Sequence, residues 1–125
     1  MKSVFGSHKY EDKKHKEKIE KWASEDRLGS NVVITGETKD VRYKGENGVK
    51  KHLSPKLHGA STVIVLVGED THTSKGVEYE IQHAKSEGKK IIPVRIPGTK
   101  GASPKSIRDI DLVAFEPHAI KKALK

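Results

Sequence analysis

The chain has 125 residues and no cysteine, and its formal net charge is +8 because Lys and Arg outnumber Asp and Glu. This length suits one domain, residues 1–125, with a core of its own, and the lack of cysteine excludes disulfides, thiolate catalysis and cysteine-ligated zinc. No apolar run reaches the roughly 18 residues of a membrane span and no signal peptide opens the chain, so we expect a cytoplasmic protein without a membrane partner.

Strand and helix signals alternate along the chain. Apolar runs rich in β-branched residues predict strands, and apolar positions with a helical period, together with capping residues, predict helices. In chain order the expected elements are a strand at 2–5, a helix at 11–23, a strand at 31–35, a polar loop at 36–45, a helix at 46–58, a strand at 63–67, a helix from 74 to about 84, a strand at 90–95, a short helix at 103–107, a strand at 112–115 and a helix at 117–124. Pro93 lacks a ladder donor, so we expect a strand end or a bulge there. The lysines of the first helix, Lys16 among them, are expected on a solvated face.

The third strand and the helix after it form the unit around which the other elements are arranged. The run Val63–Val67 does not alternate, so we expect this strand to be covered on both faces, as in a parallel sheet. A short polar loop follows, and Ser74 can cap a helix whose buried face carries Val77, Ile81 and Ala84. A strand, a polar loop and a helix in this order place ligands at the carboxyl edge of a parallel sheet.

Five strands alternating with helices predict an α/β fold, a three-layer doubly wound sheet of five parallel strands. Right-handed crossovers and the small size favour the flavodoxin-like strand order 2-1-3-4-5. In this order the first and third strands are neighbours. The loops that follow them, residues 6–10 and 68–73, would therefore converge at the carboxyl edge of the sheet.

Glu80 lies at a border on the helix after the third strand. At about 100° per residue it is roughly 65° from the centre of the apolar stripe, between core and solvent, in the second turn. A carboxylate there could face a ligand. The alternative is that Glu78 and Glu80 only favour the helix N-terminus through its dipole, and spacing alone favours this alternative, since such charges usually only solvate a helix.

Three chemistries that occur on this fold lack their residues here. FMN binding needs a Ser/Thr/Gly-rich phosphate loop after the first strand, but residues 6–10 are bulky after the second position, so we expect no flavin. Receiver phosphorylation needs an acidic pair directly after the first strand and a Lys after the fifth, whereas Glu11 and Asp12 come late and the Lys is missing. Neither GxGxxG nor GxxxxGK[ST] occurs, so dinucleotide-binding and P-loop motifs are absent.

The seven histidines show neither HxH nor HExxH spacing. His8, His72 and Asp70 would lie near the expected ligand edge and could in principle bind a metal, but without ligand spacing we interpret them as polar loop residues and predict no metal site. The basic balance would suit nucleic acid. However, the lysines are scattered and few aromatic residues lie among them, so nucleic acid is not an expected partner.

Residues 4–8 (VFGSH), 60–71 (ASTVIVLVGEDT) and 73–81 (TSKGVEYEI) share one resemblance. They are similar to the small TIR-like domains grouped with the TIR component of the Thoeris antiphage system, and the similarity extends from Val4 to about Phe115. This resemblance implies a five-stranded flavodoxin-like sheet. For active members, it also implies cleavage of the nicotinamide–ribose bond of NAD, or the use of NAD to make a cyclic nucleotide signal.

The family pattern further implies site residues. The catalytic Glu of TIR enzymes stands six residues after a Ser and directly before an aliphatic residue, and Ser74, Glu80 and Ile81 match these positions. The aromatic position of the pattern holds Gly76, a departure that removes a stacking surface. With Glu80 as the catalytic residue, the resemblance and the converging loops predict nucleotide-binding residues at Ser7, His8, Lys9, Tyr10, Asp70 and Ser74.

The leading hypothesis is a TIR-like signalling domain that binds a nicotinamide nucleotide, with NAD as a substrate rather than a resident cofactor and with cleavage as the further step. The alternative is a non-catalytic interaction module that resembles a response-regulator receiver and acts without phosphorylation. Because TIR enzymes commonly need self-association, we also expect a protein partner or a second copy of the chain.

Overall fold

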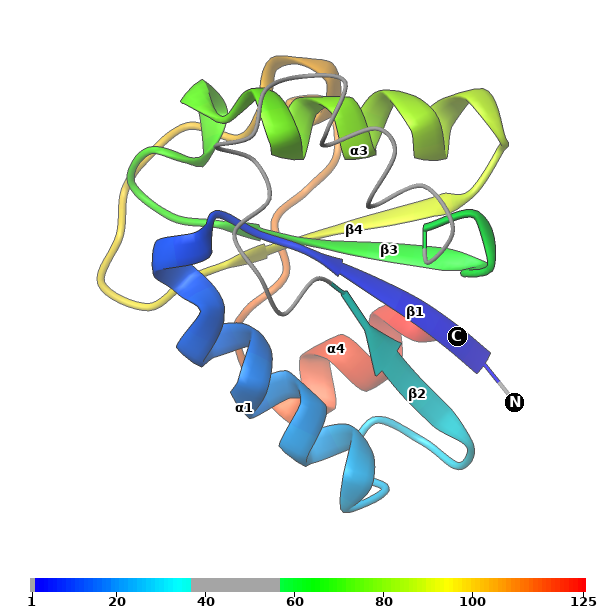
Figure 1. Cartoon of the computed structure of the whole chain (residues 1–125). Helices are drawn as coiled ribbons and strands as arrows, with labels where there is room; N and C mark the ends of the chain where they lie inside the picture. Colours follow the sequence, from blue (N-terminus) through cyan, green and yellow to red (C-terminus); the bar gives the residue numbers. More distant parts are fainter. Residues whose placement is uncertain (1, 37–56) are drawn as a thin grey trace.

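The computed structural model describes residues 2–36 and 57–125 (Figure 1). In these residues one parallel sheet has the strand order β2-β1-β3-β4. The strands are β1 (Lys2–Ser7), β2 (Val32–Thr35), β3 (Thr62–Val67) and β4 (Lys90–Arg95). The α-helices are α1 (Lys13–Ser24), α3 (Lys75–Ser86) and α4 (Pro117–Leu124), and the short 3-10 helices are η1 (Tyr10–Asp12), η3 (Thr71–Thr73) and η4 (Lys105–Ile107). The loop expected at 36–45, apart from its first residue, and the helix expected at 46–58, apart from its last two residues, lie outside the described part of the chain.

Strand β3 lies between β1 and β4, and all six of its residues are buried. Alternate side chains enter the two cores on opposite faces of the sheet. The first core contains Phe5, Leu57, Ala60, Val63, Val65, Val67, Val77, Ile81, Ala84 and Ile107. The second contains Val4, Ile19, Trp22, Ala23, Leu28, Ile64, Leu66, Ile92, Val94, Ile96, Ile120 and Leu124. The prediction that this strand is covered on both faces is therefore confirmed.

The helices form the outer two layers. Helix α3 covers one face, while α1 and α4 cover the other (Figure 1). The apolar stripe of α3, with Val77, Ile81 and Ala84 fully buried, is the one that the sequence predicted. The α/β class and the three layers are thus confirmed.

The expected fifth strand at residues 112–115 is reduced to one parallel bridge between Val94 and Val113. The Val113 amide donates to the Pro93 carbonyl at 2.8 Å, and the Val113 carbonyl accepts from the Arg95 amide at 3.0 Å. Pairing stops there because the Glu116 amide bonds back to the Ala114 carbonyl at 2.9 Å, which turns the chain away from the sheet edge. Within the described residues the sheet therefore has four strands, not five.

Pro93 does not end or bulge β4, as the sequence analysis expected. It lies inside the strand and pairs in register with Val65 of β3. Its carbonyl points away from β3, toward Val113. The amide side of the same residue points that way too, so the missing N–H falls on the outer edge, where no ladder bond of the β3–β4 pair is lost.

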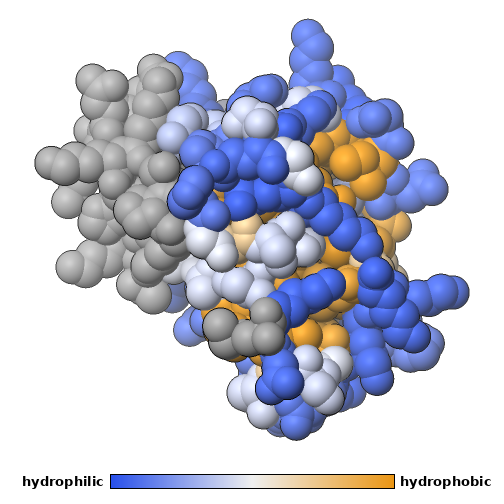
Figure 2. Space-filling model, turned by 90° about the vertical axis from the view of Figure 1, so that its right-hand side faces the viewer, coloured by the Kyte–Doolittle hydropathy of each residue, from blue (hydrophilic) through white to orange (hydrophobic). Residues whose placement is uncertain are grey.

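The surface is mostly polar. On the face shown in Figure 2, hydrophilic side chains surround smaller apolar areas. No helix within residues 2–36 and 57–125 has both the length and the apolar character needed to cross a membrane.

Candidate functional site

Ser7 and Glu80 meet where the carboxyl end of β1 passes under α3. The Ser7 hydroxyl donates a hydrogen bond of 2.6 Å to Glu80 Oε1. Ser7 is two residues after Phe5 in β1, so both side chains lie on the face of the sheet that α3 covers. Glu80 lies in the second turn of that helix. This side-chain contact joins the end of β1 to α3, the helix that follows the predicted loop at residues 68–73.

Glu80 is more deeply buried than its place on the helix suggested. Its side chain was expected at the border between core and solvent, but the residue is 1% exposed and Ser7 is 0% exposed. The helical wheel fixes only the angle of a side chain around its helix, while burial also depends on what the neighbouring strand places over it. Here the end of β1 packs against the second turn of α3 and covers Glu80.

Burying a carboxylate carries a free-energy cost that an apolar side chain would avoid. A buried acid held by a hydroxyl at the carboxyl edge of a parallel sheet is typical of a functional site rather than of a packing requirement.

The remaining residues of the loop after β1 lead directly into α1. His8 is buried at 3% exposure, with Nδ1 at 3.4 Å from the Gly6 carbonyl oxygen. Lys9 is half-buried, and its carbonyl accepts from the Asp12 amide at 2.9 Å. Tyr10 begins η1. The structure therefore places His8 directly beside the Ser7–Glu80 pair in the chain, while Lys9 and Tyr10 form the turn into the helix.

Ser74 and Asp70 act within their own turns. The Ser74 hydroxyl accepts from the Val77 amide at 3.2 Å, which makes Ser74 the N-cap of α3, as predicted. Asp70 is exposed, and its carbonyl accepts from the amide and the hydroxyl of Thr73. In the described residues no hydrogen bond joins either residue to Ser7 or Glu80.

Lys16 is the main correction on the α1 side of this edge. It was expected on a solvated face, but it is 5% exposed. Its aliphatic stem lies against Gly6 and Gly36 at the ends of β1 and β2, where a Cβ at Gly36 would stand 2.5 Å from Lys16 Cε. Its Nζ lies 3.4 Å from Glu20 Oε1. The two glycines leave the room that lets this side chain lie flat on the sheet.

Glu78, the other acid of the α3 N-terminal half, has a different partner from Glu80. The Ser106 hydroxyl lies 2.8 and 2.9 Å from its two carboxylate oxygens, and Gln82 Nε2 lies 3.3 Å from Oε1. Glu78 therefore ties η4 to α3. Gly76, at the aromatic position of the family pattern, is buried in the first turn of the helix.

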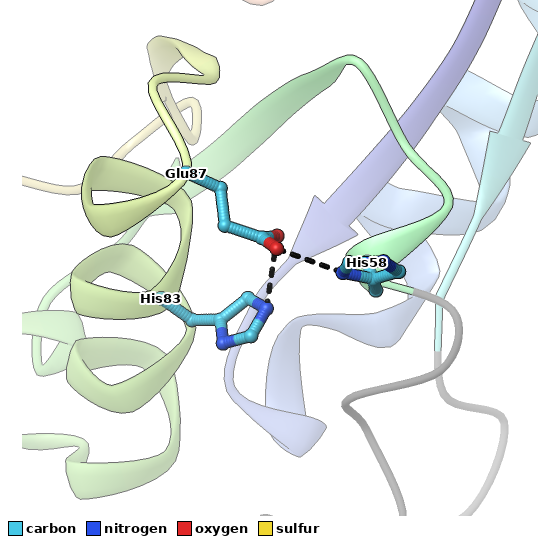
Figure 3. Close-up of side chains that lie close together, drawn as sticks. All are labelled: His58, His83 and Glu87. Atoms are coloured by element: carbon cyan, nitrogen blue, oxygen red, sulfur yellow. Dashed lines mark hydrogen bonds and ion pairs between the residues drawn. The ribbon is translucent and has the colours of Figure 1, made fainter.

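His58, His83 and Glu87 form a cluster that the sequence analysis missed (Figure 3). His8, His72 and Asp70, the metal-binding alternative considered from the sequence, form no such group in the described residues. The signal was the four-residue spacing of His83 and Glu87, which share a helix face. This spacing was not used because the helix was expected to end at about residue 84. In the structure α3 continues to Ser86, and Glu87 is its C-cap.

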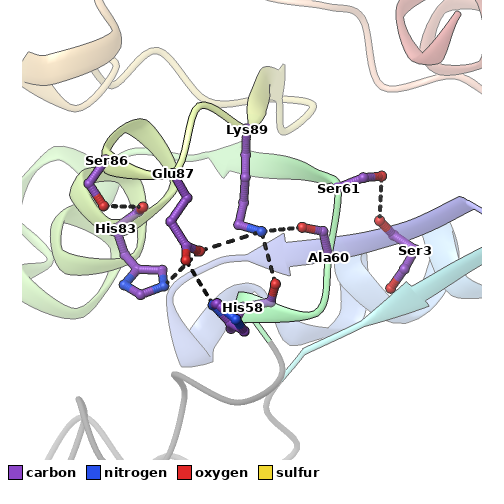
Figure 4. A network of polar contacts seen from close by, with 8 residues as sticks. All are labelled: Ser3, His58, Ala60, Ser61, His83, Ser86, Glu87 and Lys89. Atoms are coloured by element: carbon purple, nitrogen blue, oxygen red, sulfur yellow. Dashed lines mark hydrogen bonds and ion pairs between the residues drawn. The ribbon is translucent and has the colours of Figure 1, made fainter.

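This cluster belongs to a wider polar network at the amino edge of the sheet (Figure 4). Lys89 Nζ donates to the carbonyls of His58, at 3.0 Å, and of Ala60, and it lies 3.5 Å from Glu87 Oε1. The network therefore fixes the segment before β3 against the end of α3, at the opposite end of that helix from the Ser7–Glu80 pair.

Comparisons with known proteins agree with this fold. The sequence matches the family model of the Thoeris protein ThsB, TIR-like domain, over residues 5–101. The fold is similar to the crystal structure of a prokaryotic SEFIR domain, with a TM-score of 0.56 and 18% sequence identity over 99% of this chain and 88% of that chain. At that identity the likeness shows the fold alone. No curated protein matches the chain.

The molecule is thus a TIR-like α/β domain, a class of signalling and defence modules. Because the family match spans more than half of the chain, the chain belongs to the TIR-like family of the Thoeris protein ThsB.

Proposed function

We propose that this TIR-like domain binds a nicotinamide nucleotide at the carboxyl edge of its sheet and cleaves the nicotinamide–ribose bond of NAD with Glu80 as the catalytic residue. The observation that carries the proposal is the buried Ser7–Glu80 hydrogen bond. Family membership supports it, because the Ser74–Glu80–Ile81 pattern resembles that of TIR enzymes.

The chemistry suits a fixed carboxylate. When the bond between C1′ of the ribose and the nicotinamide nitrogen breaks, neutral nicotinamide leaves and positive charge develops on C1′ and the ring oxygen. A carboxylate in a water-poor position stabilises that charge more strongly than one in bulk water. Water then adds to C1′ and releases its proton to solvent. Ser7 acts as a positioning residue, since its hydroxyl holds Oε1 of Glu80.

Incubation of the protein with millimolar NAD, followed by chromatography for nicotinamide and ADP-ribose, tests the catalytic step. Glu80→Gln should lower turnover by about a hundredfold or more, because it removes the negative charge. Glu78→Gln is the matched control, since Glu78 pairs with Ser106 instead, and it should retain turnover. Saturation-transfer NMR with NAD tests binding separately, and E80Q should still bind.

The absence of both turnover and binding at millimolar NAD, under crowding conditions as well, would contradict this proposal. Crowding matters because we expect the active state to be a self-associated one. If the wild type bound NAD without turnover, the proposed nucleotide site would be supported and the catalytic role of Glu80 would be contradicted.

A non-catalytic interaction module is the second candidate. The observations in its favour are the 1% exposure of Glu80 in the single chain and the Gly at position 76. Capture of a defined protein partner, with no reaction toward NAD or acetyl phosphate, would favour it. Phosphorylation of Asp70 by acetyl phosphate would instead indicate ordinary receiver chemistry.

A further inference from the structure

His58, His83 and Glu87 direct their ligand atoms at one point beside the amino edge of the sheet (Figure 3). Glu87 Oε2 lies 2.7 Å from His58 Nδ1, and Glu87 Oε1 lies 3.0 Å from His83 Nε2. One nitrogen of each imidazole and one carboxylate oxygen all lie within 4.8 Å of one another. In the described ranges, 2–36 and 57–125, no other group of three such residues is this close.

The distances from the Glu87 oxygens to the two imidazole nitrogens are compatible with a bound metal ion. A tetrahedral metal at about 2.0–2.1 Å from nitrogen and oxygen ligands separates those ligands by about 3.3 Å. The observed separations from Glu87 are slightly shorter, so small side-chain rotations would admit an ion. A metal would take the place of the proton shared by His58 Nδ1 and Glu87 Oε2, because imidazoles bind metals in their neutral form.

The three ligands come from two parts of the fold that are distant in sequence. His83 and Glu87 are four residues apart at the end of α3, so their side chains share one face. His58 precedes β3 and is held by its backbone, because Lys89 Nζ donates to its carbonyl at 3.0 Å. A bound ion would therefore join two elements, as structural metal ions do in small domains.

Lys89 sets the expected strength of the site. Its Nζ lies 3.5 Å from Glu87 Oε1, and its side chain is 10% exposed. A positive charge at this distance opposes the binding of a cation. We therefore expect a weaker site than one built from three ligands without a neighbouring cation.

We propose that His58, His83 and Glu87 bind one zinc ion, which clips the segment before β3 to the C-terminal end of α3. Two imidazole nitrogens and a carboxylate are a donor set that suits zinc, and the fourth position would be left for water. Glu87 is seven residues from Glu80, roughly 10 Å along the helix. The site is thus separate from the Ser7–Glu80 pair and does not depend on the function proposed there.

Calorimetric titration of the full chain, without a histidine tag, with zinc chloride near neutral pH tests the proposal. The wild type should bind one zinc ion per chain, and cobalt(II) should give the intense visible bands of a four-coordinate complex. His58→Ala, His83→Ala and Glu87→Gln should each weaken zinc affinity by at least about tenfold. His72→Ala and His118→Ala are the controls, because both residues are exposed and lie outside the cluster, and they should keep wild-type affinity.

His58→Ala is the decisive variant. The His58 side chain is 71% exposed, so its removal leaves both cores intact, and circular dichroism checks the fold. Zinc should raise the thermal midpoint of the wild type but not that of H58A. Equal zinc affinity in H58A and the wild type would overturn the proposal, as would a wild type that binds no zinc at about 0.1 mM.

Discussion

The hydroxyl of Ser7 donates a 2.6 Å hydrogen bond to Glu80 Oε1 across 73 residues of sequence, at a position that solvent does not reach. This contact links the end of β1 to the second turn of α3. Both residues belong to the carboxyl edge, where parallel α/β sheets bind their ligands. The pair therefore couples the stability of the fold to the geometry of the candidate site.

Ser7→Ala should lower the free energy of unfolding by about 1–3 kcal/mol, because a buried carboxylate oxygen loses a donor. Urea denaturation measures this change. Ser3→Ala is the matched control on the same strand, where the residue is half-buried, and it should stay within about 0.5 kcal/mol of the wild type. Equal losses in the two variants would contradict the importance of the hydrogen bond.

The pairing itself is tested by a double-mutant cycle. In an E80Q background, Ser7→Ala should have a smaller effect, since a neutral amide oxygen depends less on the hydroxyl than a carboxylate does. An unchanged effect of S7A in that background would mean that Ser7 stabilises the fold through other contacts.

Ser74→Ala should lower the free energy of unfolding by about 1 kcal/mol, because the first turn of α3 loses its cap on the Val77 amide. Ser74→Asp should restore most of it, since Asp is a good N-cap and favours the helix dipole. Ser86→Ala, at the other end of α3, is the control and should have little effect. Chemical denaturation of the three variants decides, and an S74A curve that overlays the wild type would exclude the capping role.

The fold was predictable where local patterns were strong. The unbroken apolar run of β3 predicted burial on both faces, and the stripe of Val77, Ile81 and Ala84 predicted the inner face of α3. The fifth strand was not predictable from its four residues, because a short apolar segment can stop pairing after one bridge. Pro93 was misinterpreted because the sequence does not state toward which neighbour an amide points.

The candidate site was predictable in part. Strand order and the family pattern named Ser7 and Glu80 as residues of one edge, but neither predicted that they would bond to each other in a buried position. Lys16 was missed because its burial depends on Gly6 and Gly36, which belong to other elements. Burial of this kind is a tertiary property and is not contained in a helical wheel.

Gly101→Ala should destabilise the protein by about 2 kcal/mol or more, since a Cβ there would overlap the carbonyl oxygens of Gly68 and Glu69. These contacts are to backbone, so no side-chain rotation can relieve them. The loop carrying Gly101 would lift from the loop after β3, and the 2.7 Å bond from the Lys100 amide to Glu69 Oε1 would be lost. Thermal and urea unfolding measure the effect.

Ala102→Ser is the control for this substitution, because Ala102 is the exposed neighbour of Gly101 and a hydroxyl there meets solvent. Its free energy of unfolding should be the same as that of the wild type. If G101A also retained the stability of the wild type, the close approach of the two loops would not exist in solution.

The charge of Glu87 should make stability depend on pH in acid. Desolvation acts to raise the pKa of this carboxyl, but the hydrogen bond from His58 and the positive charges of its neighbours outweigh it, so the pKa lies below its ordinary value of 4.5. A lowered pKa in the folded state means that the carboxylate stabilises the fold above pH 4.5, and that this contribution is lost as the pH falls through the lowered pKa.

Glu87→Gln removes the titration of this carboxyl. Thermal midpoints measured with EDTA from about pH 6 to about pH 3 should therefore differ between the wild type and E87Q at the upper end and converge at the lower end. A difference that stayed constant over this range would mean that the Glu87 charge adds nothing to stability.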